Sequence, residues 1–204
     1  MMRKNIFIHV LSFIVFWLSA TLVNAQSNNM LNNPFADEKA DYWIAVGYAM
    51  IEEVNDDPCF VIRYGGYFTQ DITLNENEAG KFVLLIGLAS SERVKVDGKI
   101  TGLPYLYGYM LGAENVGDIS SSQIFSYLQG SDMLYSSSIQ SEWVVIWDVF
   151  EIQEYTKSIR IFLNQASQRG VPHNGSAALF DELGVYLFAS LNEATAFVDQ
   201  FYYH

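Results

Sequence analysis

The strongest constraint on the fold is a succession of short runs rich in β-branched and aromatic residues, each bounded by Gly, Asn, Asp or Ser. Such runs are typical of strands in an all-β protein, and the body of the chain shows no long helical periodicity. The sequence therefore predicts an all-β fold, an antiparallel β-sandwich. The expected strands are 42–51, 59–64, 67–74, 81–90, 93–96, 105–111, 123–128, 143–152, 158–164 and 177–188.

Two glycine-containing pairs predict turns between these strands. Gly65-Gly66 supplies residues that tolerate positive φ, and Asp97-Gly98 is typical of a hairpin. Residues 113–138, rich in serine, predict a loop or insertion between sheet strands.

One short helix is expected at the C-terminal end. Ser190 and Glu193 form the S-x-x-E pattern of a capping box, and Ala194, Phe197 and Val198 share one helical face, with Phe201 a turn further on. We expect this face to pack on the sandwich.

The first 25 residues have the order of a secretory signal peptide. Arg3 and Lys4 precede an apolar stretch over 6–18, and Val23 and Ala25 are small residues at the positions that a signal peptidase reads. The stretch is shorter than the ~20 residues that a membrane span needs. We expect cleavage after Ala25, a single domain over 26–204, no membrane span after cleavage, and a secreted, extracytoplasmic protein.

The charge of the mature chain limits its partners. The full chain has 23 acidic and 11 basic side chains. Because Arg3 and Lys4 leave with the leader, nine basic side chains remain and the formal charge is −14. Such a surface repels phosphate backbones and anionic lipid, so nucleic acid is not an expected partner.

Cys59 is the one cysteine in the sequence, so the chain has no internal disulfide. It begins an apolar run, which favours a buried, inert thiol over a nucleophile. The mature chain also has no G-x-S-x-G motif, and its histidines, His173 and His204, lie in no catalytic pattern.

Three stretches between residues 31 and 185 follow one another in a familiar order. They are LNNPF at 31–35 with Tyr42, Trp43 and Gly47; GGYFTQDITL at 65–74 with KFVLLIGLAS at 81–90; and SIRIFL at 158–163 with ALFDELGV at 178–185. Together they resemble the jelly-roll carbohydrate-binding modules and their galactose-binding-like relatives. The resemblance implies two antiparallel sheets, a glycan site on the concave face or at the loop tips, and often a structural calcium ion.

The resemblance implies that Asp181 is a calcium ligand, and Asp37 or Glu38 would supply a second carboxylate. The chain departs from the family at Ala36, where such modules usually carry an acidic residue. Because calcium takes six to eight oxygen ligands, an ordinary turn or surface role for these acids stays open.

Tyr105, Tyr107 and Tyr109 recur at period two, which places three rings on one face of a strand. Tyrosine rings with hydroxyls at their edges suit stacking against sugar C–H faces, with Gln70 and Asn164 as candidate hydrogen-bonding amides. The alternative is that the three rings line a core or cover a neighbouring strand.

Trp143 and Trp147 also share one face of a strand, and that strand is apolar on both faces. Such strands are usually central and buried, so a core role is favoured over a ligand-binding one. The sequence thus predicts a domain that binds rather than cuts, with carbohydrate or another extracellular protein as partner. A polysaccharide lyase or hydrolase on the same sandwich is a further alternative.

Overall fold

The computed structural model describes residues 29–92, 95–96, 99–100, 102–112, 123–126, 143–166 and 176–201. The predicted signal peptide and most of the predicted loop at 113–138 lie outside these ranges. Within them the chain forms, in order, β1 (Ile44–Val54), β2 (Asp57–Thr73), β3 (Phe82–Ser91), β4 (Lys95–Val96), β5 (Lys99–Ile100), β6 (Leu103–Gly112), β7 (Gln123–Ser126), β8 (Val144–Glu151), β9 (Thr156–Ala166), β10 (Ala178–Phe188) and α3 (Leu191–Phe201). No described helix is both long and apolar enough to cross a membrane.

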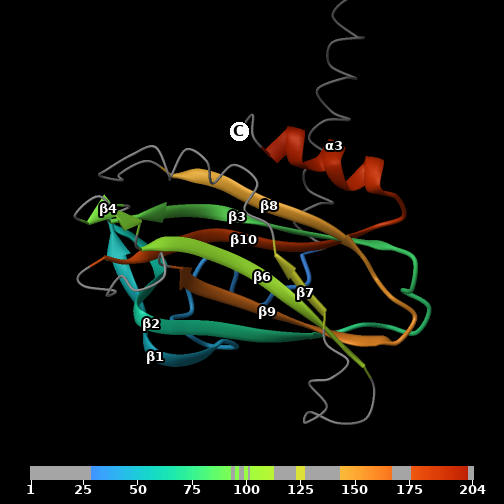
Figure 1. Cartoon of the computed structure of the whole chain (residues 1–204), viewed down its shortest axis with the longest axis horizontal. Helices are drawn as coiled ribbons and strands as arrows, with labels where there is room; N and C mark the ends of the chain where they lie inside the picture. Colours follow the sequence, from blue (N-terminus) through green and yellow to red (C-terminus); the bar gives the residue numbers. More distant parts are fainter. Residues whose placement is uncertain are drawn as a thin grey trace, which may run out of the picture.

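The main sheet of the described residues has the order β7-β6-β9-β2-β10-β3-β8, with β1 paired to β2 and every pairing antiparallel. It bends into two layers (Figure 1). The first layer holds β7, β6, β9 and the end of β2, and the second holds the start of β2 with β10, β3 and β8. The predicted antiparallel sandwich with a C-terminal helix is confirmed.

The core lies between the layers, where inward side chains of both are almost fully buried. It includes Phe60 and Phe68 of β2, whose rings lie 5.2 Å apart, and Leu85, Ile161 and Phe180 from β3, β9 and β10. These residues alternate along each strand with outward ones, as expected for strands with one face on a core.

The predicted turn at Gly65-Gly66 is wrong, because residues 57–73 form one continuous strand. Residues 60–62 pair with β10 and residues 67–73 pair with β9, so β2 serves both layers. Gly65 has φ +75°, which bends the strand, while β1 stays paired to it through a register shift beside Gly47 (φ +66°). A Cβ on Gly66 would lie 2.6 Å from the carbonyl carbon of Tyr48, so only glycine allows β1 this close.

Helix α3 covers the outer face of the second layer. The amide of Glu193 donates to Ser190 Oγ at 3.3 Å, which confirms the predicted N-cap. Ala194 and Val198 are buried, and the Phe197 ring lies 4.8 Å from that of Tyr186 on β10. The helix face predicted from the sequence therefore packs on the sheet.

Candidate functional site

The outer face of the first layer is aromatic. On β6 the side chains of Leu106 and Met110 are buried in the core, while Tyr105, Tyr107 and Tyr109 are half-buried on the opposite face. The structure therefore places the three tyrosines together on the outside of the sandwich, as the period of two predicts.

Two further rings join them from neighbouring strands. Phe162 of β9 stacks on Tyr107, with centroids 5.0 Å apart and planes 7° apart, and Tyr109 meets it edge-on at 5.4 Å. Tyr67 of β2 lies 5.6 Å from Phe162, and Tyr105 lies 4.8 Å from Tyr107. We call these five residues, Tyr67, Tyr105, Tyr107, Tyr109 and Phe162, the aromatic platform.

The strand register explains why these rings meet. Tyr107 pairs with Phe162, while Asn164 lies between Tyr105 on one side and Tyr67 on the other. Paired residues in an antiparallel sheet share a face and lie about 5 Å apart, so aromatic residues on three strands form one surface. The sequence analysis missed Tyr67 and Phe162, whose signal was their alternation with the buried Phe68 and Leu163.

Polar groups border the platform. Asn164 Nδ2 donates a hydrogen bond to the Tyr107 hydroxyl at 3.4 Å. Burial raises the pKa of Tyr107 above its usual value, so the phenol stays neutral and both donates and accepts at physiological pH. At one end, Arg160 of β9 forms two hydrogen bonds to Asp71 of β2.

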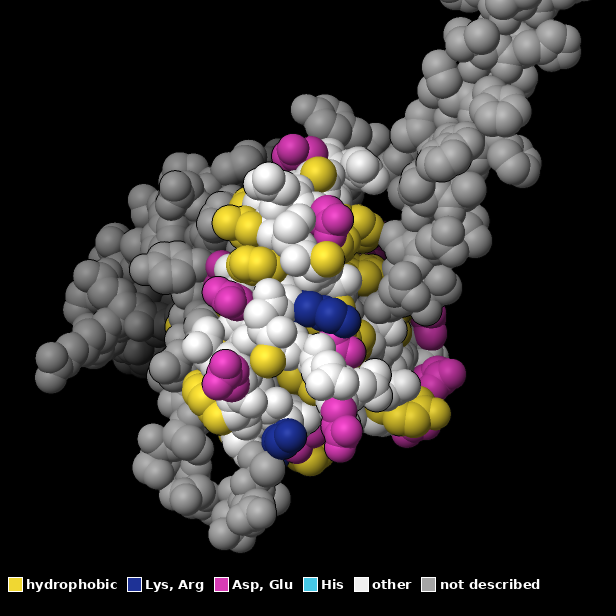
Figure 2. Space-filling model, turned by 90° about the vertical axis from the view of Figure 1, so that its right-hand side faces the viewer, with side chains coloured by type: hydrophobic (Ala, Val, Ile, Leu, Met, Phe, Trp, Pro, Cys, Tyr) yellow, Lys and Arg dark blue, Asp and Glu magenta, His cyan; other side chains and the backbone are white. Residues whose placement is uncertain are grey.

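The platform continues onto the edge of the sheet. Val46 and Ile44 of β1 pair with Tyr67 and Thr69, and they are 38% and 64% exposed. Apolar surface therefore reaches across four strands, from β6 to β1. Figure 2 shows an end of the sandwich, where acidic side chains are spread among hydrophobic ones and the few Lys and Arg side chains in view lie apart from one another.

Gln70 does not join the platform. It lies on the inward face of β2 between Phe68 and Ile72 and is 5% exposed. Its Oε1 accepts from the Asn32 amide at 2.8 Å, and its Nε2 donates to the Asn32 carbonyl at 3.0 Å. With both amide atoms engaged, Gln70 anchors the N-terminal segment to the sandwich, so we leave it out of the binding surface.

The two tryptophans lie on the second layer, away from the tyrosines. Trp147 packs with Val145, Leu84 and Ile86 in the cluster beneath α3, so the strand is apolar on both faces because a helix covers it. The inference that β8 is central is wrong, since it ends the described strand order. Trp143 packs instead beside Cys59, Val61 and Leu179.

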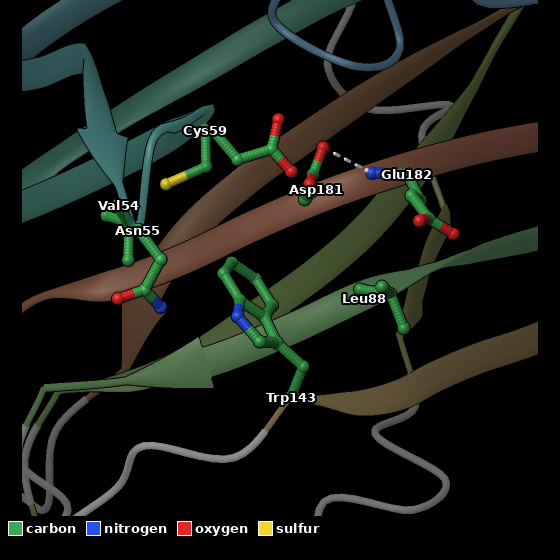
Figure 3. Close-up of a pocket in the computed structure, with 8 residues that line it drawn as sticks. Val54, Asn55, Cys59, Leu88, Trp143, Asp181 and Glu182 are labelled. Atoms are coloured by element: carbon green, nitrogen blue, oxygen red, sulfur yellow. Dashed lines mark hydrogen bonds between the residues drawn. The ribbon is translucent and has the colours of Figure 1, made fainter.

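Trp143 lines a small pocket of about 230 Å³ on the second layer. Its indole extends toward Asn55 and Asp181 (Figure 3). The pocket is lined by Val54, Asn55, Asp57, Cys59, Leu88, Trp143, Asp181 and Glu182.

Two ionisable groups in this pocket have raised pKa values. Burial, reinforced by the charge of Asp57, raises the pKa of Asp181 to about 6, although the Glu182 amide donates to Asp181 Oδ1 at 2.7 Å and opposes the shift. Burial, with the charge of Asp181, also raises the pKa of Cys59 to about 12. The thiol is therefore protonated and a poor nucleophile at physiological pH.

The calcium prediction rests on Asp181 and Asp37. Asp37 is exposed, and its charge is a small contributor to the raised pKa of Asp181. Among the described residues, no three His, Cys, Asp or Glu side chains are grouped as metal ligands. The acidic ligand set that calcium prefers is thus not assembled by these side chains, and calcium binding stays a prediction.

Solved structures share this fold. The enzymatically active domain of tailspike protein 4 of bacteriophage CBA120 superposes with a TM-score of 0.50 and 14% identity, over 78% of this chain and 21% of that one. The chain therefore spans about a fifth of that protein. TmCBM61, solved in complex with β-1,4-galactotriose, superposes with a TM-score of 0.50 and 14% identity, over 79% of this chain and 99% of that one.

The class of fold follows from this likeness: the chain has the jelly-roll sandwich fold of the carbohydrate-binding modules, as the sequence predicts. No protein-family model matches the sequence, and no curated protein matches it significantly.

Proposed function

We propose that the chain is an exported, non-catalytic module that binds a saccharide on the aromatic platform. The observation that carries the proposal is the stack of Tyr107 on Phe162, flanked by Tyr105 and Tyr109, on an outer sheet face. No helix covers these rings among the described residues, whereas α3 covers the outer face of the other layer.

The chemistry of the platform suits a sugar ring. Aromatic faces pack against the apolar C–H face of a pyranose, and a few placed polar groups fix its orientation. The Tyr107 hydroxyl and Asn164 supply such groups at the centre of the platform. Since Phe162 holds Tyr107 in place, binding costs little side-chain ordering.

The fold likeness supports the choice of a first probe. TmCBM61 was solved with β-1,4-galactotriose, so β-1,4-galactan oligosaccharides are a suitable start, within a wider panel of plant and bacterial glycans. The proposal that the module is exported rests on the sequence of residues 1–25 and is tested by finding the mature N-terminus at residue 26 in secreted protein.

The direct test is glycan binding by residues 26–204, followed by titration calorimetry on each hit. Tyr107→Ala is expected to weaken binding by about thirtyfold, because truncating a central aromatic contact costs about 2 kcal/mol. Tyr107→Phe keeps the stack on Phe162 and loses the hydroxyl, so it should weaken binding less.

Tyr64→Ala is the matched control, since Tyr64 is 51% exposed and its ring pairs with Tyr48, which does not belong to the platform. It should leave affinity unchanged. Equal losses in both alanine variants, or self-association without any glycan binding, would contradict the proposal. Release of reducing ends from a bound glycan would contradict its non-catalytic part.

A further inference from the structure

One end of the aromatic platform is bordered by an ion pair with two hydrogen bonds. Arg160 Nε lies 2.6 Å from Asp71 Oδ1, and Arg160 Nη2 lies 2.7 Å from Asp71 Oδ2. Arg160 pairs with Tyr109 of β6 on one side and with Asp71 of β2 on the other, so the three residues form one row across the strands. The pair therefore borders any ligand that lies on these rings.

The ion pair uses the part of arginine that recognises carboxylates. A guanidinium binds a carboxylate through two parallel N–H groups. In Arg160, the N–H groups on Nε and Nη2 form this pair of hydrogen bonds with Asp71. The hydrogen bond to Asp71 is the largest cause that raises the pKa of Arg160 above its usual value, so the guanidinium stays charged.

Arg160 is also the one cation among the described side chains in the rows of the platform. These rows are Tyr105, Asn164, Tyr67 and Val46; Tyr107, Phe162, Thr69 and Ile44; and Tyr109, Arg160 and Asp71. With Arg160 neutralised, the platform presents no free positive charge to a ligand. A carboxylated sugar would meet the negative charge of Asp71 and a guanidinium already engaged.

We propose that Asp71 is a specificity-determining residue that holds Arg160 and restricts the platform to uncharged saccharides, excluding uronate-containing ones. This inference rests on the proposed function of the platform. Neutral sugars lose nothing at this end, because their hydroxyls donate to the outer lone pairs of the Asp71 carboxylate.

Asp71→Asn separates the charge of Asp71 from its shape. Asn has nearly the same size, but it leaves the Arg160 guanidinium with a free charge beside Tyr109. The side chains of Arg160 and Asp71 are 31% and 51% exposed, and exposed pairs of this kind contribute little to stability, so the variant should fold.

The experiment compares neutral galactan oligosaccharides and oligogalacturonides of equal length in titration calorimetry. The wild-type chain is expected to bind the neutral probe much more tightly than the anionic one, whose affinity is weak but measurable. Asp71→Asn should bind the oligogalacturonide about tenfold more tightly than wild type, because one new charge-assisted hydrogen-bonded pair forms. Its affinity for the neutral probe should change by less than about twofold, since the asparagine side chain keeps a carbonyl oxygen that accepts a hydrogen bond from the same sugar hydroxyl.

Two controls isolate the mechanism. Asp199→Asn, on α3 at the opposite layer, makes the same change in net charge and should gain nothing. The double variant Asp71→Asn, Arg160→Gln should lose the gain, because the guanidinium is gone.

The outcomes separate this inference from the proposed function. If wild type binds the neutral probe but Asp71→Asn gains no anionic binding, or if wild type already binds both probes equally, the role of Asp71 is overturned while the platform stands. If neither protein binds any glycan of the panel, the platform itself is overturned, and the role of Asp71 with it.

Discussion

Asp181 gives the protein a pH dependence whose sign is opposite to that of most acidic residues. It is 8% exposed, and burial followed by the charge of Asp57 raises its pKa from 3.8 to about 6. A raised carboxyl pKa means that the native state holds the proton more tightly than the unfolded chain. The resulting stabilisation is fully present below about pH 4 and is lost as the pH rises through 6.

The size of the effect follows from the shift. A change from 3.8 to about 6 is about two pKa units, and each unit corresponds to 1.36 kcal/mol, so ionised Asp181 costs at most roughly 3 kcal/mol at neutral pH. Asp181→Asn removes the charge and keeps an oxygen to accept from the Glu182 amide. We expect it to raise the free energy of unfolding by roughly 1–3 kcal/mol at pH 7.5 and by almost nothing at pH 4.

The assay is urea denaturation followed by circular dichroism from pH 4 to 7.5, with the free energies extrapolated linearly. Glu182→Gln is the matched control, because Glu182 is the exposed neighbour and its removal makes the same change in charge. The difference between Asp181→Asn and wild type should rise between about pH 4 and pH 6 and level off above pH 6.

Two results would refute this reasoning. One is a difference that does not vary with pH. The other is a loss of stability in Asp181→Asn that appears with calcium and disappears with a chelator. The second result would show that Asp181 holds a metal ion, as the sequence resemblance implies.

Two further predictions concern the sandwich itself. Gly66→Ala should lower the free energy of unfolding by about 3 kcal/mol, because the new Cβ would lie 2.6–2.8 Å from backbone atoms of Tyr48. Gly65→Ala meets no atom within 4 Å and should cost only about 1 kcal/mol for its positive φ, so equal urea midpoints for the two variants would contradict the packing argument. Cys59 is 1% exposed, and its pKa is raised to about 12. A thiol reagent at pH 8 should therefore label Cys59 only as fast as the chain unfolds. Labelling of the native protein within the mixing time would show that the thiol is accessible.

The sequence predicts the local pattern of the platform but not its full extent. Period-two alternation is a property of one strand, so Tyr105, Tyr107 and Tyr109 could be placed on one face without knowing their neighbours. Phe162 and Tyr67 join them only because β6 pairs with β9 and β9 with β2. Which strands pair is decided by the whole chain, and no local pattern specifies it.

Other departures from the sequence interpretation have similar physical causes. Gln70 was expected to face a ligand. Because side chains alternate between the two faces of a strand, Gln70 lies on the same side of β2 as Phe68 and Ile72, which is the interior. The alternation itself held that information. The two apolar faces of β8, including Trp147, reflect coverage by α3, a contact with a segment about 40 residues further along the chain that strand periodicity alone does not reveal.

The continuity of β2 decides how a load applied to the bound ligand would travel. Tyr67 lies on the platform, and Phe60 of the same strand is locked into the opposite layer. A pull on a polymer held at Tyr67 therefore passes along covalent backbone into the second layer, rather than across the interface between layers. Shearing the two layers apart therefore requires β2 to separate from β9 or β10.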